Sequence, residues 1–395
     1  MKKSIAKILG LAVLSLSMIT TSCSKDDDNG SGGNSTFELN RENLTGEIND
    51  GEVILESGTY KLTGKLIVKA GAKLTIKAGV RIEATPAADG DFGAVRYIAV
   101  AQGGEIHVQG TASNPVIMTS TIKSPGKWGG LVLCGRAPIN KGVTASAEVS
   151  DLTYGGTNSN DTSGSIKYLR IEYPGFSYNS EKEFNGLSMF GVGKGTTIEY
   201  VQVYESSDDG FEWFGGTVDA KYLVVTNKHA EIGDDLFDWT EGWIGNGENW
   251  YGIRTNAGNR GVEADNNSNN HLATPISFPT IKNLTLIGMG SGTDTSSESQ
   301  AFKLRVGTKG KFDNVVLKGW KTGFDVQHDE SVGYAGGDLK ATRVKFEDVP
   351  VKSIGKNTAG ATIDVSAIFT EDATATGAGN GTTAPSWSAG WTIGL

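Results

Sequence analysis

Residues 185–189 read NGLSM, residues 209–213 read DGFEW and residues 235–239 read DLFDW. The three segments align without gaps at offsets of 24 and 26 residues. A repeat of this length, with one short apolar strand in each copy, is typical of one coil of a parallel β-helix. The repeat therefore predicts that equivalent positions on successive coils lie directly above one another.

A second type of short strand precedes these segments and recurs further along the chain. Its copies are Lys167–Ile171, Glu199–Val203, Lys221–Val225, Lys282–Leu286 and Asp313–Leu317. From Leu66 to Val108, apolar and polar residues alternate in short runs that end near glycine. Such runs, joined by tight turns and with no stretch of helical period, are typical of β-strands. The sequence predicts an all-β chain folded as a single-stranded right-handed parallel β-helix.

The composition predicts one elongated domain. The 55 glycines in 395 residues are about twice the usual share of ~7%, as expected of a chain that turns often. Residues 37–395 contain no second break in composition. Because solenoids grow by adding coils, this length does not require a division into two domains.

Alternation within each strand predicts which side chains face inward. The interior ladder is expected to contain Leu187, Phe211, Phe237, Phe302 and Phe324. The exterior ladder is expected to contain Ser188, Glu212, Asp238, Lys303 and Asp325. The opposite assignment would bury several unpaired charges, each at a cost of several kcal/mol. The same alternation points Trp213 and Trp239 inward.

The first 22 residues predict export. Three lysines precede an apolar run from Ile8 to Ile19, and small residues lead to Cys23. This is the pattern of a lipoprotein signal peptide over residues 1–22, with lipidation at Cys23. The apolar run is too short to span a bilayer of ~30 Å, so we expect membrane attachment through the N-terminal lipid.

Residues 23–36 form an acidic and Gly/Ser-rich tether. Its stretch Ser24–Asp28 resembles the signal that exports Bacteroidetes lipoproteins, which predicts an outer-membrane location facing outside. Removal of residues 1–22 takes away three lysines and changes the formal net charge from -9 to -12. So acidic a chain excludes nucleic acid as a partner, because phosphate binding needs clustered Lys and Arg. With Cys23 lipidated, Cys134 is left alone, and we expect no intrachain disulfide.

The acidic segments allow three interpretations. The first is structural: Asp208, Asp209, Asp234 and Asp235 cap turns by accepting backbone N–H bonds. In the second, the same four residues bind Ca²⁺, which prefers six to eight oxygen ligands.

The third interpretation is catalytic. Strands on adjacent coils lie ~4.8 Å apart, close to the ~5 Å between the carboxyl groups of retaining glycosidases. Glu212 and Asp238 would then act as acid and as nucleophile or base. A lyase would instead need a basic residue, for which Lys303 is the candidate.

Residues 240–280 interrupt the spacing of the repeat and predict an insertion over the coils. This interval is rich in Trp, Asn and Gly, and exposed aromatic rings beside polar groups suit sugar rings. The predicted ligand-binding residues are Trp243, Trp250, Tyr251, Arg254 and Arg260.

The sequence also resembles a family of Bacteroidetes-type surface lipoproteins that are predicted to be β-helical. The resemblance is carried by Leu62–Gly79, Gly110–Val116, Trp128–Val132, Tyr168–Tyr173, Gly195–Tyr200 and Asp208–Gly216. It implies a β-helix at the cell surface and no particular activity. Gly233–Asp235 in addition resembles the acidic pairs of the polygalacturonase and pectate-lyase β-helix superfamily, although that family's glycine-flanked histidine is absent here.

Together these features favour a noncatalytic outer-membrane lipoprotein that binds an extracellular polysaccharide or a partner in a nutrient-uptake complex. Two alternatives stay open. One is a calcium-assisted polysaccharide lyase or glycoside hydrolase of the pectin-degrading β-helix type. The other is a purely structural cell-surface protein.

Overall fold

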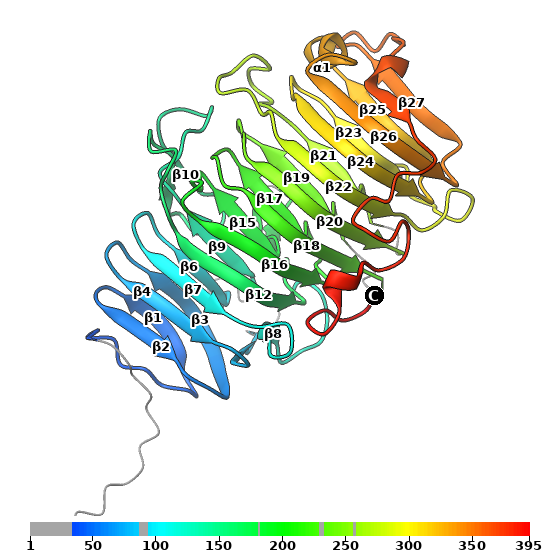
Figure 1. Cartoon of the computed structure of the whole chain (residues 1–395). Coiled ribbons are helices and arrows are strands. Elements are labelled where there is room, and N and C mark those ends of the chain that lie inside the picture. Colours follow the sequence, from blue (N-terminus) through cyan, green and yellow to red (C-terminus); the bar gives the residue numbers. More distant parts are fainter. Residues whose placement is uncertain (1–33, 87–93, 181, 229–232, 256–257) are drawn as a thin grey trace, which may run out of the picture.

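The computed structural model describes residues 34–86, 94–180, 182–228, 233–255 and 258–395. The predicted signal peptide, Cys23 and most of the tether lie outside these residues. Among the described residues, no helix is both long and apolar enough to cross a membrane. The chain forms a solenoid whose coils stack along one axis (Figure 1).

Nearly all strands belong to one parallel 24-stranded ladder that winds around this axis. The first coils are built from β1 (Leu44–Ile48), β2 (Glu52–Leu55), β3 (Thr59–Val68), β4 (Lys73–Lys77), β5 (Arg81–Ala84), β6 (Tyr97–Val100), β7 (Glu105–Gln109) and β8 (Val116–Ser120). Each pairs with the equivalent strand of the next coil in parallel register. The predicted fold class, a right-handed parallel β-helix, is confirmed.

From residue 131 onward most coils contribute one short and one long strand. The short strands are β9 (Leu131–Cys134), β15 (Leu187–Phe190), β17 (Phe211–Phe214), β19 (Phe237–Thr240), β21 (Val262–Ala264), β23 (Gln300–Leu304), β25 (Thr322–Gln327) and β27 (Val351–Lys356). The long strands are β12 (Gly164–Glu172), β16 (Thr197–Tyr204), β18 (Ala220–Asn227), β20 (Asn246–Arg254), β22 (Thr280–Ile287), β24 (Gly310–Lys318) and β26 (Leu339–Glu347). Strand β28 (Phe369–Glu371) pairs with β26, and α1 (Asp329–Tyr334) lies near the same end.

Each long strand bends at one residue with a left-handed backbone. The bend residues are Tyr168, Tyr200, Tyr222, Asn249, Asn283, Asn314 and Arg343, with φ between 53° and 60°. Asparagine tolerates this conformation better than most residues, and the three asparagines stack. The Asn283 amide donates to Asn249 Oδ1 at 3.0 Å, and that of Asn314 donates to Asn283 Oδ1 at 2.8 Å. One long strand therefore covers two faces of the solenoid.

The interior ladder predicted from the sequence is confirmed. Register places Leu187 beside Phe211, Phe211 beside Phe237, and Phe302 beside Phe324. Val262 occupies the coil between Phe237 and Phe302. These side chains and the indoles of Trp213 and Trp239 are fully buried in the main core, so the polarity argument identified the inward face correctly.

The predicted insertion over residues 240–280 is wrong for most of this interval, and only residues 265–279, between β21 and β22, form a longer connection than the equivalent ones on the neighbouring coils. This interval contributes β20 and β21, which continue the ladders in register, with Trp250 aligned to Leu223 and Leu284. Its Trp243 and Trp250 stack on Trp213 inside the solenoid, with ring centroids 4.6 and 5.0 Å away. The sequence pattern was misread because large aromatic residues occupy positions that hold aliphatic residues on the neighbouring coils.

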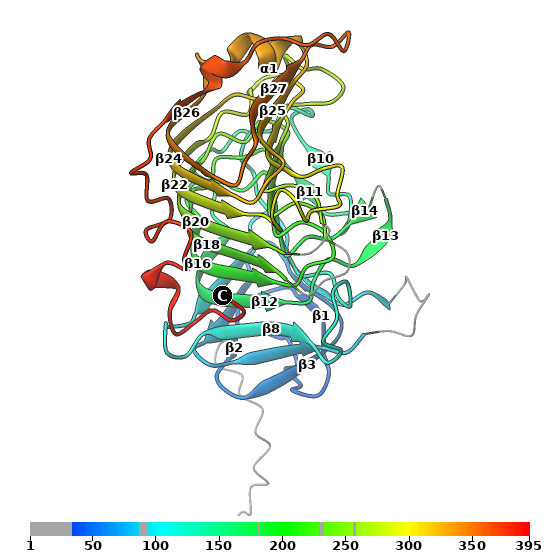
Figure 2. The same ribbon diagram turned by 90° about the vertical axis from the view of Figure 1, so that its right-hand side faces the viewer.

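The C-terminal segment, residues 372–395, returns along the outside of the long strands and ends near β12 (Figures 1 and 2). The Trp391 indole is fully buried and meets the edges of Tyr168 and Tyr200, at centroid distances of 6.0 Å. The Gln202 amide group donates to Ile393 O at 2.7 Å and accepts from Ile393 N at 2.9 Å. The segment is thus fastened across several coils.

We expect Trp391→Ala to lower the free energy of unfolding by about 3–5 kcal/mol, the usual cost of emptying a large buried aromatic site. Residues 372–395 should also become sensitive to limited proteolysis. The measurements are thermal unfolding and protease cleavage followed by mass spectrometry. Leu395→Ala is the control, because that side chain is 38% exposed; equal effects of the two substitutions would contradict this role for Trp391.

Candidate functional site

The exterior ladder on the short strands carries three carboxylates on consecutive coils. Register places Glu212 beside Asp238 and Asp238 beside Glu263. Ser188 precedes them, and Lys303 and Asp325 follow. The predicted exterior ladder is therefore confirmed, with Glu263 as a member that sequence reasoning missed. The signal was present, because Gly261–Ala264 repeats the glycine, apolar, acidic, apolar pattern of Gly210–Trp213 and places Glu263 25 residues after Asp238.

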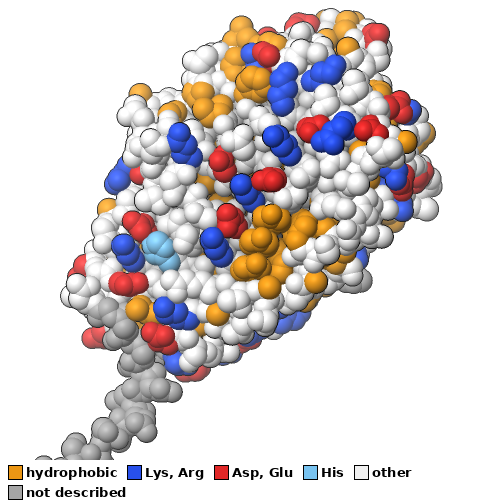
Figure 3. Space-filling model, in the orientation of Figure 1, with side chains coloured by type: hydrophobic (Ala, Val, Ile, Leu, Met, Phe, Trp, Pro, Cys, Tyr) orange, Lys and Arg blue, Asp and Glu red, His pale blue; other side chains and the backbone are white. Residues whose placement is uncertain are grey.

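A ladder of charged residues elsewhere on the solenoid shows how the fold usually treats stacked charges. On the first halves of the long strands, register gives the order Lys167, Glu199, Lys221, Glu248, Lys282, Asp313. The signs alternate, and Lys167 pairs with Glu199 at 3.0 Å. Figure 3 shows basic and acidic side chains interspersed over this face. The run Glu212, Asp238, Glu263 departs from this alternation.

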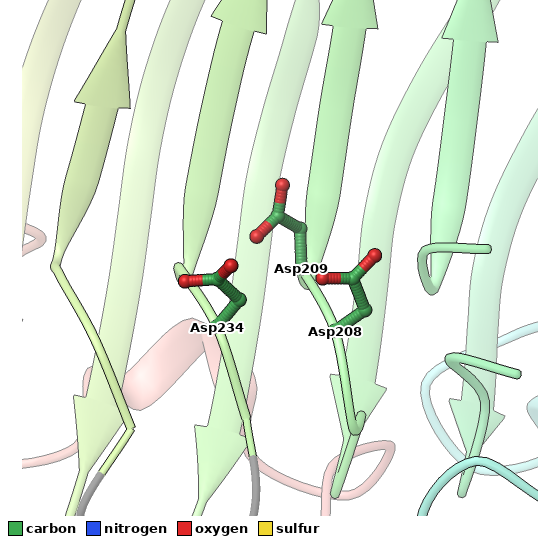
Figure 4. A group of neighbouring side chains, drawn as sticks. All are labelled: Asp208, Asp209 and Asp234. Carbon is green, nitrogen blue, oxygen red and sulfur yellow. The ribbon is translucent and has the colours of Figure 1, made fainter. Parts of the chain in front are cut away.

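Further acidic residues lie just before the short strands. Figure 4 shows the carboxylates of Asp208, Asp209 and Asp234 gathered on adjacent coils. With the ladder they make up the acidic cluster, which we define as Asp208, Asp209, Glu212, Asp234, Asp235, Asp238 and Glu263. Three subsets have carboxylate oxygens within 4.8 Å of one another: Asp208, Asp209 and Asp234; Asp209, Glu212 and Asp238; and Asp235, Asp238 and Glu263.

Two members of the acidic cluster accept backbone N–H bonds from the next coil. Asp209 Oδ1 accepts the backbone N–H of Asp235 at 2.8 Å, and Asp235 Oδ1 accepts that of Arg260 at 2.6 Å. The structural interpretation therefore holds in part for these two residues, because their carboxylates bind backbone N–H groups but join neighbouring coils where a local turn cap was predicted. It does not explain Glu212 or Asp238, which lie within strands β17 and β19.

Basic residues neutralise only the C-terminal side of the cluster. Arg260 pairs with Asp235 and Glu263, each at 3.3 Å. Arg305 pairs with Glu263 at 2.9 Å. Within the described part of the chain, no ion pair with Lys or Arg reaches the four remaining carboxylates nearest the N-terminal side: Asp208, Asp209, Glu212 and Asp238.

The lack of basic partners on the N-terminal side of the cluster is reflected in the pKa values of its carboxyl groups. Burial, reinforced by neighbouring carboxylates, raises the pKa of Asp209, Glu212 and Asp238 well above the ordinary range. A hydrogen bond from Asn185 partly offsets this increase in the pKa of Glu212. Nearby, burial raises the pKa of Glu148 to about 7. The cluster therefore favours either bound protons or a bound cation.

Apart from Glu263 Oε1, which pairs with Arg305, one oxygen atom of the cluster and one beside it lack hydrogen-bond partners among the described residues. Asn185 is 1% exposed and donates from Nδ2 to Glu212 Oε2 at 2.6 Å, yet its Oδ1 accepts no hydrogen bond. Asp238 Oδ1 is likewise buried without a partner. Unpaired buried oxygens beside carboxylates are suitable ligands for a hard divalent cation.

An apolar cover borders the N-terminal side of the cluster. It is formed by residues 137–156, which include β10 (Ala145–Ser146) and β11 (Thr153–Tyr154), and by residues 174–180 and 182–184, which include β13 (Ser177–Asn179) and β14 (Lys182–Glu183). These segments project from one side of the solenoid (Figure 2). Their side chains pack on the outer surface of β6, β9 and β15, over Ala99, Val132 and Cys134. Burial there raises the pKa of the Cys134 thiol to about 12, as expected for an inert thiol.

A family model described as a pectate-lyase like beta helix domain matches residues 46–392. The chain belongs to this family. The match covers all the strands described here except the first residues of β1, and it includes the whole acidic cluster. No curated protein matches the sequence.

Within this pectate-lyase-like β-helix, the predicted aromatic binding surface is wrong. Trp243 and Trp250 are fully buried in the core, and Tyr251 packs beneath the C-terminal segment. Arg254 is also fully buried, where it pairs with Asp294 at 2.6 Å. Of the five predicted ligand-binding residues, only Arg260 contacts the acidic cluster.

Lys303 takes its predicted place in the exterior ladder, beside Glu263. Its ammonium group pairs with Glu298 at 2.8 Å, and Glu298 also binds Arg260 at 2.7 Å. Lys303 thus belongs to the neutralised side of the site.

In the presence of a chelator, Asp238→Asn should raise the melting temperature at pH 7. The pKa of Asp238 is higher in the folded chain than its unfolded value of ~3.9. Proton binding therefore favours the folded state at low pH, and this contribution is lost as the pH rises from about 4 through the folded pKa. Thermal melts between pH 4 and pH 8 should show the gain growing with pH.

Glu199→Gln is the matched control, because Glu199 belongs to the alternating ladder and pairs with Lys167. It should give no gain in melting temperature at pH 7. A melting temperature of Asp238→Asn below that of the wild type throughout this range would contradict the uncompensated charge.

Proposed function

We propose that this β-helix binds divalent cations, of which calcium fits best, in the acidic cluster and holds an anionic polysaccharide through them. The observation that carries the proposal is the run of Glu212, Asp238 and Glu263 on consecutive coils. Its first two members have no ion-pair partner among the described Lys and Arg residues, although the same fold alternates charges on another face.

The donor set supports calcium. Ca²⁺ takes six to eight oxygen ligands in flexible geometry and accepts carboxylate and amide oxygens. Glu212, Asp238 and Asp209 offer the former and Asn185 Oδ1 the latter. Bound calcium would also offset the repulsion that raises the pKa of these carboxyls.

An anionic polysaccharide is the ligand class that such a site suits. The acidic surface repels a polyanion unless bound cations bridge the two, and a cation whose coordination is completed by a sugar carboxylate supplies that bridge. The family description, which names pectate lyase, supports a polyuronate.

Glycoside hydrolysis is a second candidate, favoured by the raised pKa of Glu212 beside Asp238. A carboxyl that keeps its proton can act as general acid while a neighbouring carboxylate acts as nucleophile or base. Elimination is less well supported, because its base must lose a proton. Burial alone lowers the pKa of Arg305, but Asp265 and Glu263 raise it overall.

The test is calorimetric titration with calcium, followed by binding of polygalacturonate with and without chelator. We expect calcium-dependent binding that weakens by at least about tenfold in the double variant Glu212→Gln, Asp238→Asn. The double variant Glu199→Gln, Glu248→Gln removes the same number of charges from the alternating ladder and should bind like wild type. Polyuronate binding that is equal in calcium and in chelator would overturn the proposal.

The same incubations decide between binding and cleavage. New reducing ends without unsaturated products would support hydrolysis, and their absence would support binding alone. Unsaturated products would point to elimination and contradict the assignment of roles to Glu212 and Asp238.

We further propose that residues 1–22 are a cleaved signal peptide and that Cys23 carries the lipid of a Bacteroidetes-type outer-membrane surface lipoprotein. The basic and apolar pattern before Cys23 and the acidic tether after it support this. Contact with a surface protein complex for nutrient uptake is compatible with the same outer-membrane location.

Cys23→Ala should move the protein from the membrane fraction to the soluble fraction, whereas Cys134→Ala should leave it membrane-bound. Immunoblots of fractionated cells give the distribution, and protease treatment of intact cells reports the outward orientation. Retention of the Cys23→Ala variant in the membrane fraction would contradict the proposed lipid anchor.

A further inference from the structure

A hollow of about 450 Å³ lies where the apolar cover meets the first coils. Its wall includes Thr63 and Lys65 of β3, Tyr97 of β6, and Asp151 and Tyr178 of the cover. Volumes of this size are typical of small-molecule sites. Aromatic rings beside hydroxyl, carboxylate and ammonium groups match the apolar faces and polar rims of sugars.

A second hollow, of about 280 Å³, continues the first toward the acidic cluster. Asp151 and Tyr178 line both hollows, and Glu148 and Lys182 line the second. Glu148 in turn lies close enough to the cluster for its charge to raise the pKa of Glu212. From Lys65 to Glu212 the chain climbs four coils, or about 19 Å at the spacing of neighbouring strands. The two hollows and the cluster thus line up along the solenoid axis.

The aromatic part of this wall is held rigidly. Phe184 is fully buried and packs between the two tyrosines, with ring centroids 5.1 Å from Tyr97 and 5.9 Å from Tyr178. Asp151 sits at the rim with a left-handed backbone, φ 57°, a conformation that costs a non-glycine residue about 1–2 kcal/mol. The surroundings therefore fix the rings.

The lysines of the hollows differ from their neighbours in charge pairing. Lys61 and Lys73, on the same first coils, pair with Glu83 and Glu105. Lys65 and Lys182 are exposed and form no ion pair with any described acidic residue. An ammonium group without a partner beside a sugar-sized hollow is available to a ligand carboxylate.

We propose that the two hollows are subsites for an acidic oligosaccharide, with Tyr178 as the platform for a sugar ring and Lys65 and Lys182 as partners of its carboxylates. This rests on the proposed function, because the same chain would continue to the cations of the acidic cluster. The subsites make binding depend on ligand length. A ligand held at the cluster alone does not reach Lys65.

The experiment compares trigalacturonate and heptagalacturonate in calcium-containing buffer, by calorimetry. The double variant Lys65→Ala, Lys182→Ala and the single variant Tyr178→Ala should each bind the longer ligand about tenfold more weakly. Both should bind the shorter ligand within about twofold of wild type, with unchanged calcium affinity. Lys282→Ala, an exposed lysine on another face, should match wild type for both ligands.

The outcomes separate the two proposals. If wild type prefers the longer ligand and the variants keep that preference, or if wild type shows no preference, the subsites are overturned while calcium-dependent binding stands. If wild type binds neither ligand in calcium, the proposed function fails and the subsites with it. The lysine variant decides the matter should Tyr178→Ala not fold, because both lysine side chains are exposed.

Discussion

Parallel stacking in register is the constraint from which the other features of this protein follow. Because each position lies over its equivalent on the next coil, like residues become neighbours about 4.8 Å apart. For Leu187, Phe211 and Phe237 this proximity is favourable and forms the core. For charged residues it is costly: two like charges ~5 Å apart repel by about 3 kcal/mol at an effective dielectric constant of ~20. Every charged ladder must therefore alternate in sign or bind protons or counterions that offset the repulsion.

The two charged faces resolve this constraint differently. On the long strands, lysines and acids alternate from Lys167 to Asp313, so each charge has an opposite neighbour. On the short strands, Glu212, Asp238 and Glu263 follow one another, and only Glu263 meets arginine. Since the fold can alternate charges without loss of regularity, this exception has no architectural cause. The proposed cation site would account for it.

Stacking in register also explains which parts of the fold and of the site could be predicted from the sequence. Gapless offsets of 24 and 26 residues made the ladder through Leu187, Phe211 and Phe237 visible, together with the outward position of Glu212 and Asp238. Glu263 was missed because Val262 and Ala264 replace the aromatic residues that marked the two earlier copies. Trp250 and Tyr251 were misplaced because aromatic residues with Gly and Asn nearby resemble a loop, although Trp250 repeats Leu223. The size of the side chains varies along a ladder, whereas the side of the solenoid to which they point stays the same.

The hollows and the cover lay beyond sequence reasoning for a different reason. The cover joins residues 137–156 to residues 174–180 and 182–184, and neither segment repeats, so no periodicity reveals that they meet. Together they border the acidic cluster on its N-terminal side. Apolar side chains shield the outer surface of β6, β9 and β15 and extend to Phe214 at the end of β17, the strand that carries Glu212, the first uncompensated carboxylate of the ladder. Arg260 and Arg305 then close the other side. On the proposed function, a polyanion that bridges to the cluster through cations would find an apolar surface on the N-terminal side, and the hollows at the rim of the cover, with Lys65 and Lys182, would offer it charged partners.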